Sequence, residues 1–416
     1  MKNKLRLFVV EPNNGGGLVH FAYQMCTALA NEGVVVTLIT GVNYELAALP
    51  HNFRVERILN LWEHFDPESM KVERQNPLKR AWRIAYWALR RVVRGMRMIL
   101  MWVRLILYLL RAKPDIVQFS TIEYSFEAFF VGYLRHRGVI VSQLCHEFEL
   151  RENLDPIWLA LDRLSGEIYR HFSIIYFLSE EIRRKFLSLH PSISEKSTFV
   201  IPHGNSGWLL NIPAISEEVL RHRYGLQENE RIVLFFGLLS PSKGLDDLLD
   251  AFAIVRKSCD VKLVIAGYPT KHISMNELLE RSKTLGISDQ IIFDAHYISL
   301  EEIRPLMGIA LVVVFPYRSG TQSGALQTAY TFGRPVIATA VGGIPDVVDD
   351  GKSGYLVPAQ SPRELADKIA VLVNNPNLAN KMGKYARYLS TTRFSWQLIA
   401  RRIKMNYEGL LDNNVQ

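Results

Sequence analysis

Residues 315–358 read FPYRSGTQSGALQTAYTFGRPVIATAVGGIPDVVDDGKSGYLVP, and this stretch decides the fold. An apolar strand is expected to end at Pro316, and a loop of small polar residues, 319–324, leads into a helical pattern. Gly333 stops that helix, and Pro335 opens the next strand. Such a loop presents free backbone N–H groups and the positive end of the helix dipole, so it suits a phosphate group.

The same alternation of strand and helix runs through the whole chain. It begins with an apolar run at 5–10, a glycine-rich turn PNNGGG at 12–17 and a helical pattern at 20–31. Ser…Glu pairs with the spacing of a capping box open helices at Ser299 and Ser361. The other apolar runs are 34–40, 116–119, 139–143, 174–178, 232–236, 261–265, 291–293, 311–315 and 336–339. The pattern predicts an α/β protein with two doubly wound parallel sheets, whose ligands bind in a central cleft beyond the carboxyl ends of the strands.

Length and composition narrow the class of protein. The 416 residues are 48% hydrophobic and 22% charged, which allows two to three domains and excludes a disordered chain or a collagen-like rod. The three cysteines, Cys26, Cys145 and Cys259, form no CxxC pair, so neither a disulfide framework nor a cysteine zinc site is indicated. The apolar run at 5–10 is too short for a signal peptide, and we expect a cytoplasmic protein.

The net charge of +8 comes from one segment. Residues 74–114 contain eleven basic and no acidic residues, which leaves −3 for the rest of the chain. Arginines recur there every seven residues from Arg83 to Arg111 and therefore share one helical face, while apolar and aromatic residues fill the other faces. No uncharged stretch approaches the roughly 18 to 20 residues that a membrane span requires.

Three interpretations of this segment remain open: a core helix with a solvated basic face, a nucleic-acid surface, and a helix lying on an anionic membrane. The sequence shows no nucleic-acid-binding motif, and the combination of arginine with tryptophan favours the membrane surface. The predicted membrane contacts are Arg83, Arg90, Arg94, Arg97, Arg104, Trp82, Trp87 and Trp102.

Several motifs occur in the order found in a known family. GRPVIAT at 333–339, VGGIPDVV at 341–348 and DGKSGYLVP at 350–358 follow FFGLLSPSKGLDDLLDAF at 235–252 and VIAGY at 264–268. With IPHGN at 201–205 and the opening glycine turn, this order resembles the retaining GT-B glycosyltransferases of family 4, the glycosyl transferases group 1. The resemblance covers nearly the whole chain and is weakest at 43–114.

The resemblance implies a GT-B fold with two Rossmann-like domains. Residues 1–205 would form an acceptor-binding domain that carries the basic segment 74–114. Residues 206–390 would bind the nucleotide-sugar donor. Residues 391–416, after Phe394-Ser-Trp396, resemble the helix that crosses back to the first domain.

The resemblance also implies two catalytic residues. Lys243 would pair with the donor pyrophosphate, where a cation stabilises a departing nucleotide diphosphate. His146, just after a predicted strand, would face the transferred sugar. An exposed turn lysine and a structural histidine are the alternatives. The implied donor site comprises Gly16, Gly17, Gly237, Lys243, Tyr268, His296, Tyr297, Gln322, Ser323, Gly324, Gln327 and Thr328.

The sequence also departs from the family. Two glutamates spaced E-x7-E are usual, but Gly320 and Thr328 occupy those positions, and Leu238 replaces a common arginine. Gln322 and Gln327 lie close enough in sequence to supply hydrogen bonds instead.

We therefore expect a retaining, metal-independent hexosyltransferase with no cofactor and no nucleic-acid partner. It would move a sugar from a nucleotide-diphosphate donor to a lipid-linked or other membrane-associated saccharide in bacterial surface polysaccharide synthesis, as a peripheral protein on the inner face of the cytoplasmic membrane. The alternatives are a catalytically silent GT-B scaffold that supports a partner transferase, and a GT-B enzyme of another reaction type, such as a sugar-nucleotide epimerase. A scaffold that binds no donor has no physical need to keep Lys243, the small-residue loop at 319–324 and His146 together.

Overall fold

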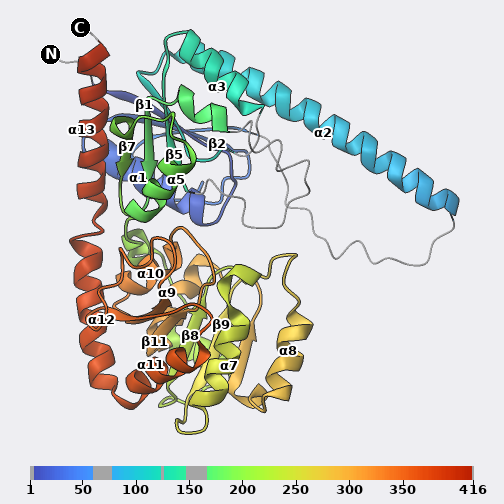
Figure 1. The fold of residues 1–416 in the computed structure, drawn as a ribbon, viewed down its shortest axis with the longest axis vertical. Helices are drawn as coiled ribbons and strands as arrows, with labels where there is room; N and C mark the ends of the chain where they lie inside the picture. Colours follow the sequence, from blue (N-terminus) through green and yellow to red (C-terminus); the bar gives the residue numbers. More distant parts are fainter. Residues whose placement is uncertain (1–3, 60–76, 123–125, 147–165, 415–416) are drawn as a thin grey trace.

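The computed structural model describes residues 4–59, 77–122, 126–146 and 166–414 (Figure 1). Within its helices, side chains are described except at 77–85, 87, 88, 91, 166, 167, 413 and 414. The described chain forms two parallel β-sheets with helices on their faces, as the sequence predicted. The first sheet uses strands between residues 6 and 200, and the second uses strands between 232 and 357.

The first sheet has the strand order β3-β2-β1-β4-β5-β6-β7, and every pairing is parallel. Its strands are β1 (Arg6–Glu11), β2 (Val35–Gly41), β3 (Arg54–Leu59), β4 (Ile116–Phe119), β5 (Ile140–Cys145), β6 (Ile174–Phe177) and β7 (Thr198–Val200). The edge strands β3 and β7 were not predicted, because a strand with one neighbour needs no continuous apolar run.

The second sheet has the order β10-β9-β8-β11-β12-β13 and is also parallel. Its strands are β8 (Ile232–Phe236), β9 (Lys262–Ala266), β10 (Ile291–Asp294), β11 (Val312–Phe315), β12 (Val336–Thr339) and β13 (Gly354–Val357). In both sheets the strand order reverses beside the first strand, between β1 and β4 and between β8 and β11. Ligands of doubly wound sheets bind at such reversals.

Helices cover both faces of each sheet. The α-helices are α1 (Gly17–Asn31), α2 (Pro77–Ala112), α3 (Glu127–His136), α5 (Glu180–Leu189), α6 (Glu217–Arg223), α7 (Leu245–Val255), α8 (Met275–Thr284), α9 (Leu300–Ile309), α10 (Gly324–Thr331), α11 (Pro362–Asn374), α12 (Pro376–Thr391) and α13 (Trp396–Asn414). The 3₁₀ turns are η2 (Gly166–His171), η3 (Glu195–Ser197), η4 (Gly207–Asn211), η5 (Pro241–Lys243) and η6 (Ser288–Gln290). The capping box predicted at Ser299 is present. The one predicted at Ser361 is wrong, because the Ser361 side chain makes no capping hydrogen bond. Pro362 is the first residue of α11, as predicted.

The C-terminal helix α13 lies beside the first sheet rather than the second (Figure 1). Its residues Ile399, Ile403 and Tyr407 are buried in one core with α1. The Tyr407 hydroxyl donates to Gln118 on β4 at 2.6 Å. The chain therefore crosses back to the first sheet after completing the second. The predicted domain boundary at residue 205 and the predicted binding roles of the two halves stay predictions.

The basic segment forms the 36-residue helix α2, whose first part projects from the body (Figure 1). Its last three turns pack on the first sheet, where Met101, Trp102, Leu105, Ile106 and Leu109 are buried. None of the described helices is long and apolar enough to cross a membrane.

Trp102 was predicted to contact a membrane, and that prediction is wrong. Its indole is 4% exposed and stacks between Phe119, at 5.8 Å between ring centroids, and Phe130, at 5.4 Å. Arg97 and Arg104 are exposed, and Arg90 and Arg94 are half-buried. The side chains of Trp82, Arg83 and Trp87 lie outside the described residues, so their predicted role stays a prediction.

We expect Trp102→Ala to lower the free energy of unfolding by about 3 to 5 kcal/mol, because it empties a stacked, buried site. Leu100→Ala, on the exposed side of the same helix, is the control and should change it by less than about 0.5 kcal/mol. Urea denaturation measures both. Equal stabilities of the two variants would contradict the packing described for α2.

Candidate active site

Lys243 lies at the end of η5, directly after β8, and faces the loop that precedes α10. Its Nζ atom is 4.0 Å from the ring centroid of Tyr317, whose hydroxyl is 3.1 Å from Ser323 Oγ. Ser323 is the N-cap of α10 and accepts a hydrogen bond from the Leu326 N–H. The structure thus brings Lys243 to the small-residue loop at the α10 N-terminus, where a cation and free helix N–H groups suit a phosphate.

The η5 turn is held against this loop by a glycine and an ion pair. Gly244 has a left-handed backbone, and a Cβ there would lie 2.0 Å from the Pro316 carbonyl oxygen. Arg318 donates to both carboxylate oxygens of Asp247 at 2.8 and 2.9 Å, and its backbone N–H donates to Ser242. No local pattern in the sequence indicates this pair, because Arg318 and Asp247 are 71 residues apart.

Gly237 and Gly267 let the loops after β8 and β9 touch. A Cβ on Gly267 would lie 1.7 Å from the Gly237 carbonyl oxygen, so no other residue fits there. Gly237 also lies beside α10, since its own Cβ position is 3.8 Å from Ala325 Cβ. Tyr268 follows Gly267 and is 48% exposed, so its side chain is accessible at this edge of the sheet.

Two histidines, the half-buried His146 and the buried His203, contact the same aromatic ring on α1. The rings of His146, after β5, and His203, in the IPHGN motif, both pack edge-on against Phe21 on α1 with centroid distances of 5.0 Å. The His203 Nε2 atom is 3.2 Å from the Cβ position of Gly324 at the α10 N-terminus. His203 therefore lies between Phe21, which His146 also contacts, and Gly324 at the end of the 319–324 loop. His203 was not among the predicted site residues, although its place in the IPHGN motif could have identified it.

Both histidines are neutral in the folded protein. Burial, and to a smaller extent the nearby His203, lowers the pKa of His146 to about 3. Burial also lowers the pKa of His203, to about 4, against a hydrogen bond with the Gly204 carbonyl that raises it. The buried Nε2 of His146 has no hydrogen-bond partner in the part of the chain that the structure describes.

Two of the predicted donor contacts, Gln322 and Thr328, are hydrogen-bonded within the protein, and a third, Gln327, is buried. The Gln322 amide donates to the carbonyl oxygens of Leu178 and Gly343. Thr328 is 6% exposed, and its hydroxyl bonds with Ser206 and Gly324. Gln327 is fully buried, and neither of its amide atoms has a partner among the described residues. Thr328 and Thr331 of α10 bond with Ser206, so the Thr328 side chain faces the 203–206 loop.

Gly16 and Gly17 lie at the start of α1, where the sequence predicted contacts with the donor phosphates. In the structure the anion beside them is the carboxylate of Glu45. Glu45 Oε2 accepts from the Gly16 N–H at 2.8 Å and lies 3.2 Å from His20 Nε2. Its other oxygen accepts from the hydroxyl of Tyr297, which follows β10 in the second sheet. Sequence reasoning missed Glu45, which lies where the family motifs are weakest.

Glu45 is charged at neutral pH. Burial by itself would raise its pKa, but His20, Tyr297 and the Gly16 N–H lower the pKa to about 2. His296, the neighbour of Tyr297, is exposed and pairs with Asp294 at 3.0 Å.

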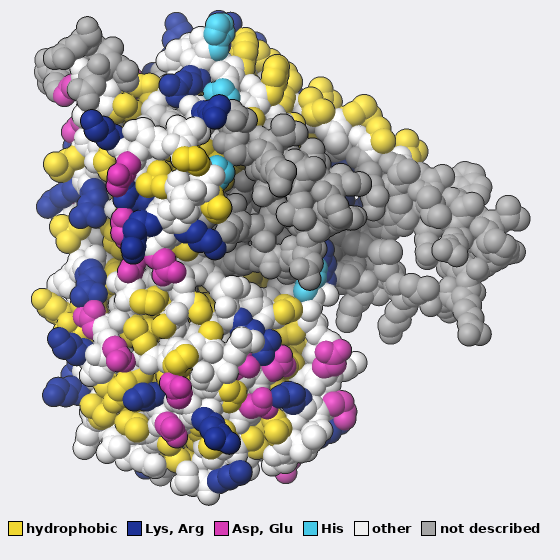
Figure 2. All heavy atoms as spheres, viewed as in Figure 1, with side chains coloured by type: hydrophobic (Ala, Val, Ile, Leu, Met, Phe, Trp, Pro, Cys, Tyr) yellow, Lys and Arg dark blue, Asp and Glu magenta, His cyan; other side chains and the backbone are white. Residues whose placement is uncertain are grey.

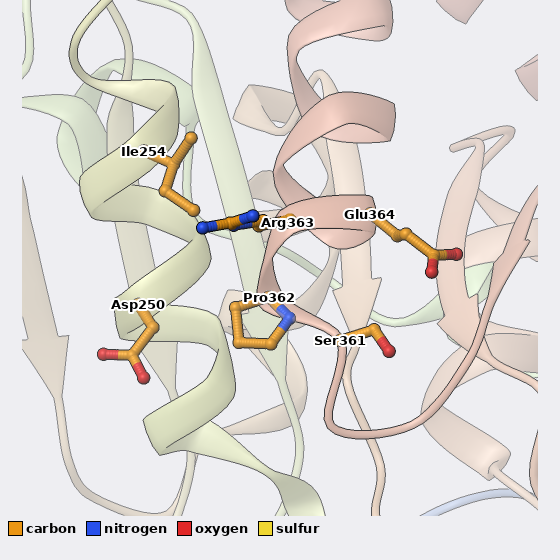
Figure 3. A pocket seen from close by; sticks show the side chains of 6 residues that line it. All are labelled: Asp250, Ile254, Ser361, Pro362, Arg363 and Glu364. Atoms are coloured by element: carbon orange, nitrogen blue, oxygen red, sulfur yellow. The ribbon is translucent and has the colours of Figure 1, made fainter.

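A shallow hollow on the outer side of the second sheet contains none of these residues. It lies between α7 and α11 and is lined by Asp250, Ile254 and the start of α11 at 361–364 (Figure 3). The Asp250 carboxylate is already paired with Arg281. Among the residues that the structure describes, no group of histidine, cysteine, aspartate or glutamate side chains could hold a metal ion.

Residues 216–388, which contain the whole second sheet and helices α6 to α11, match the family model of the glycosyl transferases group 1. The chain is 29% identical over 42% of its length to an alpha-D-kanosaminyltransferase of Streptomyces kanamyceticus, with 45% of that protein covered. It is 26% identical over 53% of its length to an N-acetyl-alpha-D-glucosaminyl L-malate synthase of Bacillus anthracis, with 58% of that protein covered. The chain thus spans about half the length of the curated relatives it matches.

Solved structures match nearly the whole chain. Anabaena HepE in complex with UDP-glucose superposes with a TM-score of 0.72 at 18% identity, covering 97% of this chain and 99% of that one. WaaG, a glycosyltransferase involved in lipopolysaccharide biosynthesis, superposes with a TM-score of 0.63 at 15% identity, covering 96% and 99%. The chain has the GT-B fold, and residues 216–388 are similar to the glycosyl transferases group 1.

The two neutral histidines predict loss of stability in mild acid. Below pH 6.5 the unfolded chain binds protons at both positions and the folded protein does not, so the free energy of unfolding falls as the pH drops towards about 4. Between pH 6.5 and 5 we expect a loss of roughly 2 kcal/mol per histidine. Urea denaturation at the two pH values measures it.

His203→Gln should reduce this loss by roughly 2 kcal/mol, whatever its effect at neutral pH. His222→Gln, at an exposed position, is the control and should leave the loss unchanged. An identical pH dependence in the His203 variant and the wild type would show that His203 is protonated in the folded protein.

Proposed function

We propose that the protein is a glycosyltransferase that moves a sugar from a nucleotide-diphosphate donor to a membrane-associated acceptor. The observation that carries the proposal is Lys243 beside Tyr317 and the N-terminus of α10. The match of the surrounding domain to the glycosyl transferases group 1, and the UDP-glucose bound to HepE, support a nucleotide-sugar donor.

The proposed chemistry is stabilisation of a leaving group. When the bond between the sugar and the nucleotide diphosphate breaks, negative charge accumulates on the phosphate oxygens. Lys243 and the backbone N–H groups at 324–325 would stabilise that charge in a fixed geometry, which is the largest contribution in many transferases. We propose that the reaction retains the configuration at the anomeric carbon and needs no metal ion.

His146 would act as a neutral hydrogen-bonding group towards the transferred sugar. Its low pKa keeps the imidazole uncharged, and its buried Nε2 has no partner among the described residues. A sugar hydroxyl would satisfy that nitrogen, and a buried polar atom left without a partner is costly. His146→Ala should then slow turnover, whereas an unchanged rate would assign the residue a structural role.

The acceptor proposal rests on helix α2. Its exposed hydrophobic side chains form a continuous stripe, at the three- and four-residue spacing of one helix face, and Figure 2 shows them along the helix where it leaves the body. The stripe consists of Leu89, Val92, Met96, Ile99, Leu100, Val103 and Leu107, each at least 40% exposed. From Leu89 to Leu107 it is roughly 27 Å long at 1.5 Å per residue.

The stripe faces away from the protein. At 100° per residue, its centre lies roughly 140° around the helix from the buried residues centred on Leu105. Arg97, Arg104 and Arg111 are exposed and lie along one border of the stripe. An apolar face bordered by arginines fits the interface of an anionic bilayer, where the side chains enter the acyl boundary and the guanidinium groups contact phosphates.

We therefore propose a peripheral protein on the inner face of the cytoplasmic membrane, acting on a lipid-linked saccharide for surface polysaccharide. The second candidate is a catalytically silent scaffold at the same membrane. It is favoured by the missing glutamates and by the burial of Gln327 and Thr328, because buried side chains do not supply hydrogen bonds to the donor in place of a glutamate. The two candidates differ in donor binding and turnover.

Lys243→Ala should lower turnover of nucleotide sugar by about 100-fold or more, because it removes a group that stabilises leaving-group charge. Lys257→Ala, an exposed lysine at the far end of α7, is the control and should retain wild-type turnover. Release of nucleotide diphosphate from a panel of nucleotide sugars is the measurement. If the wild type neither binds nor turns over any nucleotide sugar of the panel, the scaffold is supported. Near-normal turnover by Lys243→Ala would mean that the donor site is elsewhere.

Replacing Leu89, Met96 and Val103 together by aspartate should abolish sedimentation with anionic liposomes, since it places charges in the apolar stripe. Replacing Arg90, Arg94 and Arg97 by glutamine should weaken sedimentation and its salt dependence. The control carries aspartate at Leu279, Val371 and Met405, exposed positions on three other helices, and should sediment like the wild type. Unchanged sedimentation of the Leu89, Met96 and Val103 variant would refute the membrane contact.

A further inference from the structure

The glycine turn before α1 is shaped around a carboxylate. Glu45 docks on it through two contacts: its backbone N–H donates to the Asn14 carbonyl at 2.7 Å, and its Oε2 accepts from the Gly16 N–H at 2.8 Å. A Cβ on Gly15 would lie 2.6 Å from that same oxygen. Gly15 therefore lacks a side chain at the place where the Glu45 carboxylate lies.

The same carboxylate connects the two halves of the protein. Glu45 follows β2 of the first sheet, and the Tyr297 hydroxyl that it accepts from follows β10 of the second sheet. His20, on the first turn of α1, lies 3.2 Å from the carboxylate and completes its surroundings. A carboxylate whose two oxygens are contacted by Gly16, His20 and Tyr297 is a strongly bound anion, because hydrogen bonds to ionised groups are about twice as strong as neutral ones.

Two of the predicted donor contacts, Gly16 and Tyr297, are thus hydrogen-bonded to a single side chain. A sugar nucleotide that reaches from the glycine turn to the loop after β10 would need the space and the N–H group that Glu45 uses. Two anions cannot share that N–H group, because like charges at hydrogen-bonding distance repel.

We propose that Glu45 controls donor binding: its carboxylate is the resident anion of the glycine turn, and the donor diphosphate displaces it from Gly16 and thereby releases Tyr297. This inference rests on the proposed function, because it takes the donor to be a nucleotide diphosphate. Glu45 acts by competition with the ligand and by holding Tyr297, so it is a positioning residue and takes no part in bond breaking.

Removing the charge of Glu45 should make the donor bind more tightly. Glu45→Gln keeps the length of the side chain, and Glu45→Ala removes the competing group entirely. We expect both variants to bind UDP with a roughly tenfold lower Kd, the effect of losing one charge-assisted contact from the unliganded protein. Isothermal titration with UDP, and with ADP as a second probe, measures this, and thermal melting checks that each variant is folded.

The kinetic effect separates competition from a merely structural role. A group that stabilises only the unliganded enzyme affects the bound ground state and the transition state equally, so its loss lowers KM for the donor and leaves kcat nearly unchanged. A structural defect would lower kcat instead. Glu228→Gln, which removes the same charge from an exposed position, is the control and should change neither constant.

The outcomes are distinct. A lower Kd and KM in both Glu45 variants, with kcat within about twofold of wild type, supports the inference. Equal or weaker UDP binding in both variants, when the wild type binds UDP or ADP, overturns the inference alone. Absence of binding by the wild type and by both variants overturns the proposed donor site, and the inference with it.

Discussion

Residues 203–206 pack between α10 and α13 and hold the two halves of the protein together. Gly204 lies under the Trp396 indole, since a Cβ there would be 2.2 Å from the ring. The Trp396 N–H donates to Gln24 on α1 and to the Asn205 carbonyl. On the other side, Ser206 bonds to Thr328 and Thr331 of α10. This short loop follows β7, the last strand of the first sheet, and therefore connects that sheet to helix α10 beside the second sheet.

The polarity of the candidate site follows from that packing. Burial beside Phe21 keeps both His146 and His203 neutral. The positive charge near the 319–324 loop therefore comes from Lys243 and from the α10 dipole. Arg318 is near enough to touch the η5 turn, but its guanidinium is engaged by Asp247. The negative charge of Glu45 lies at the opposite element, the start of α1. The two helix N-termini thus differ: the α10 N-terminus lies near the cation Lys243, and the α1 N-terminus holds the Glu45 carboxylate.

The two ends of helix α2 have different surroundings. Near Trp102 the first sheet covers one face, and the helix is an ordinary core element. Towards Leu89 the helix extends beyond the sheet, and its apolar side chains remain exposed although nothing in their chemistry differs from those of the core. The proposed membrane contact is therefore a consequence of the length of the helix as much as of its composition.

The sequence by itself determined the elements and the order in which they meet. Apolar runs located the central strands, and the convergence of Lys243 with the 319–324 loop followed from the rule that parallel strands end at one edge. Only the tertiary structure decided which side chains point into the site, because helical periodicity assigns residues to a face without saying what that face meets. For this reason Trp102 became a core residue and Gln327 was buried. Glu45 entered the glycine turn through a fold contact 29 residues away from Gly16, and such a distant contact leaves no local pattern in the sequence.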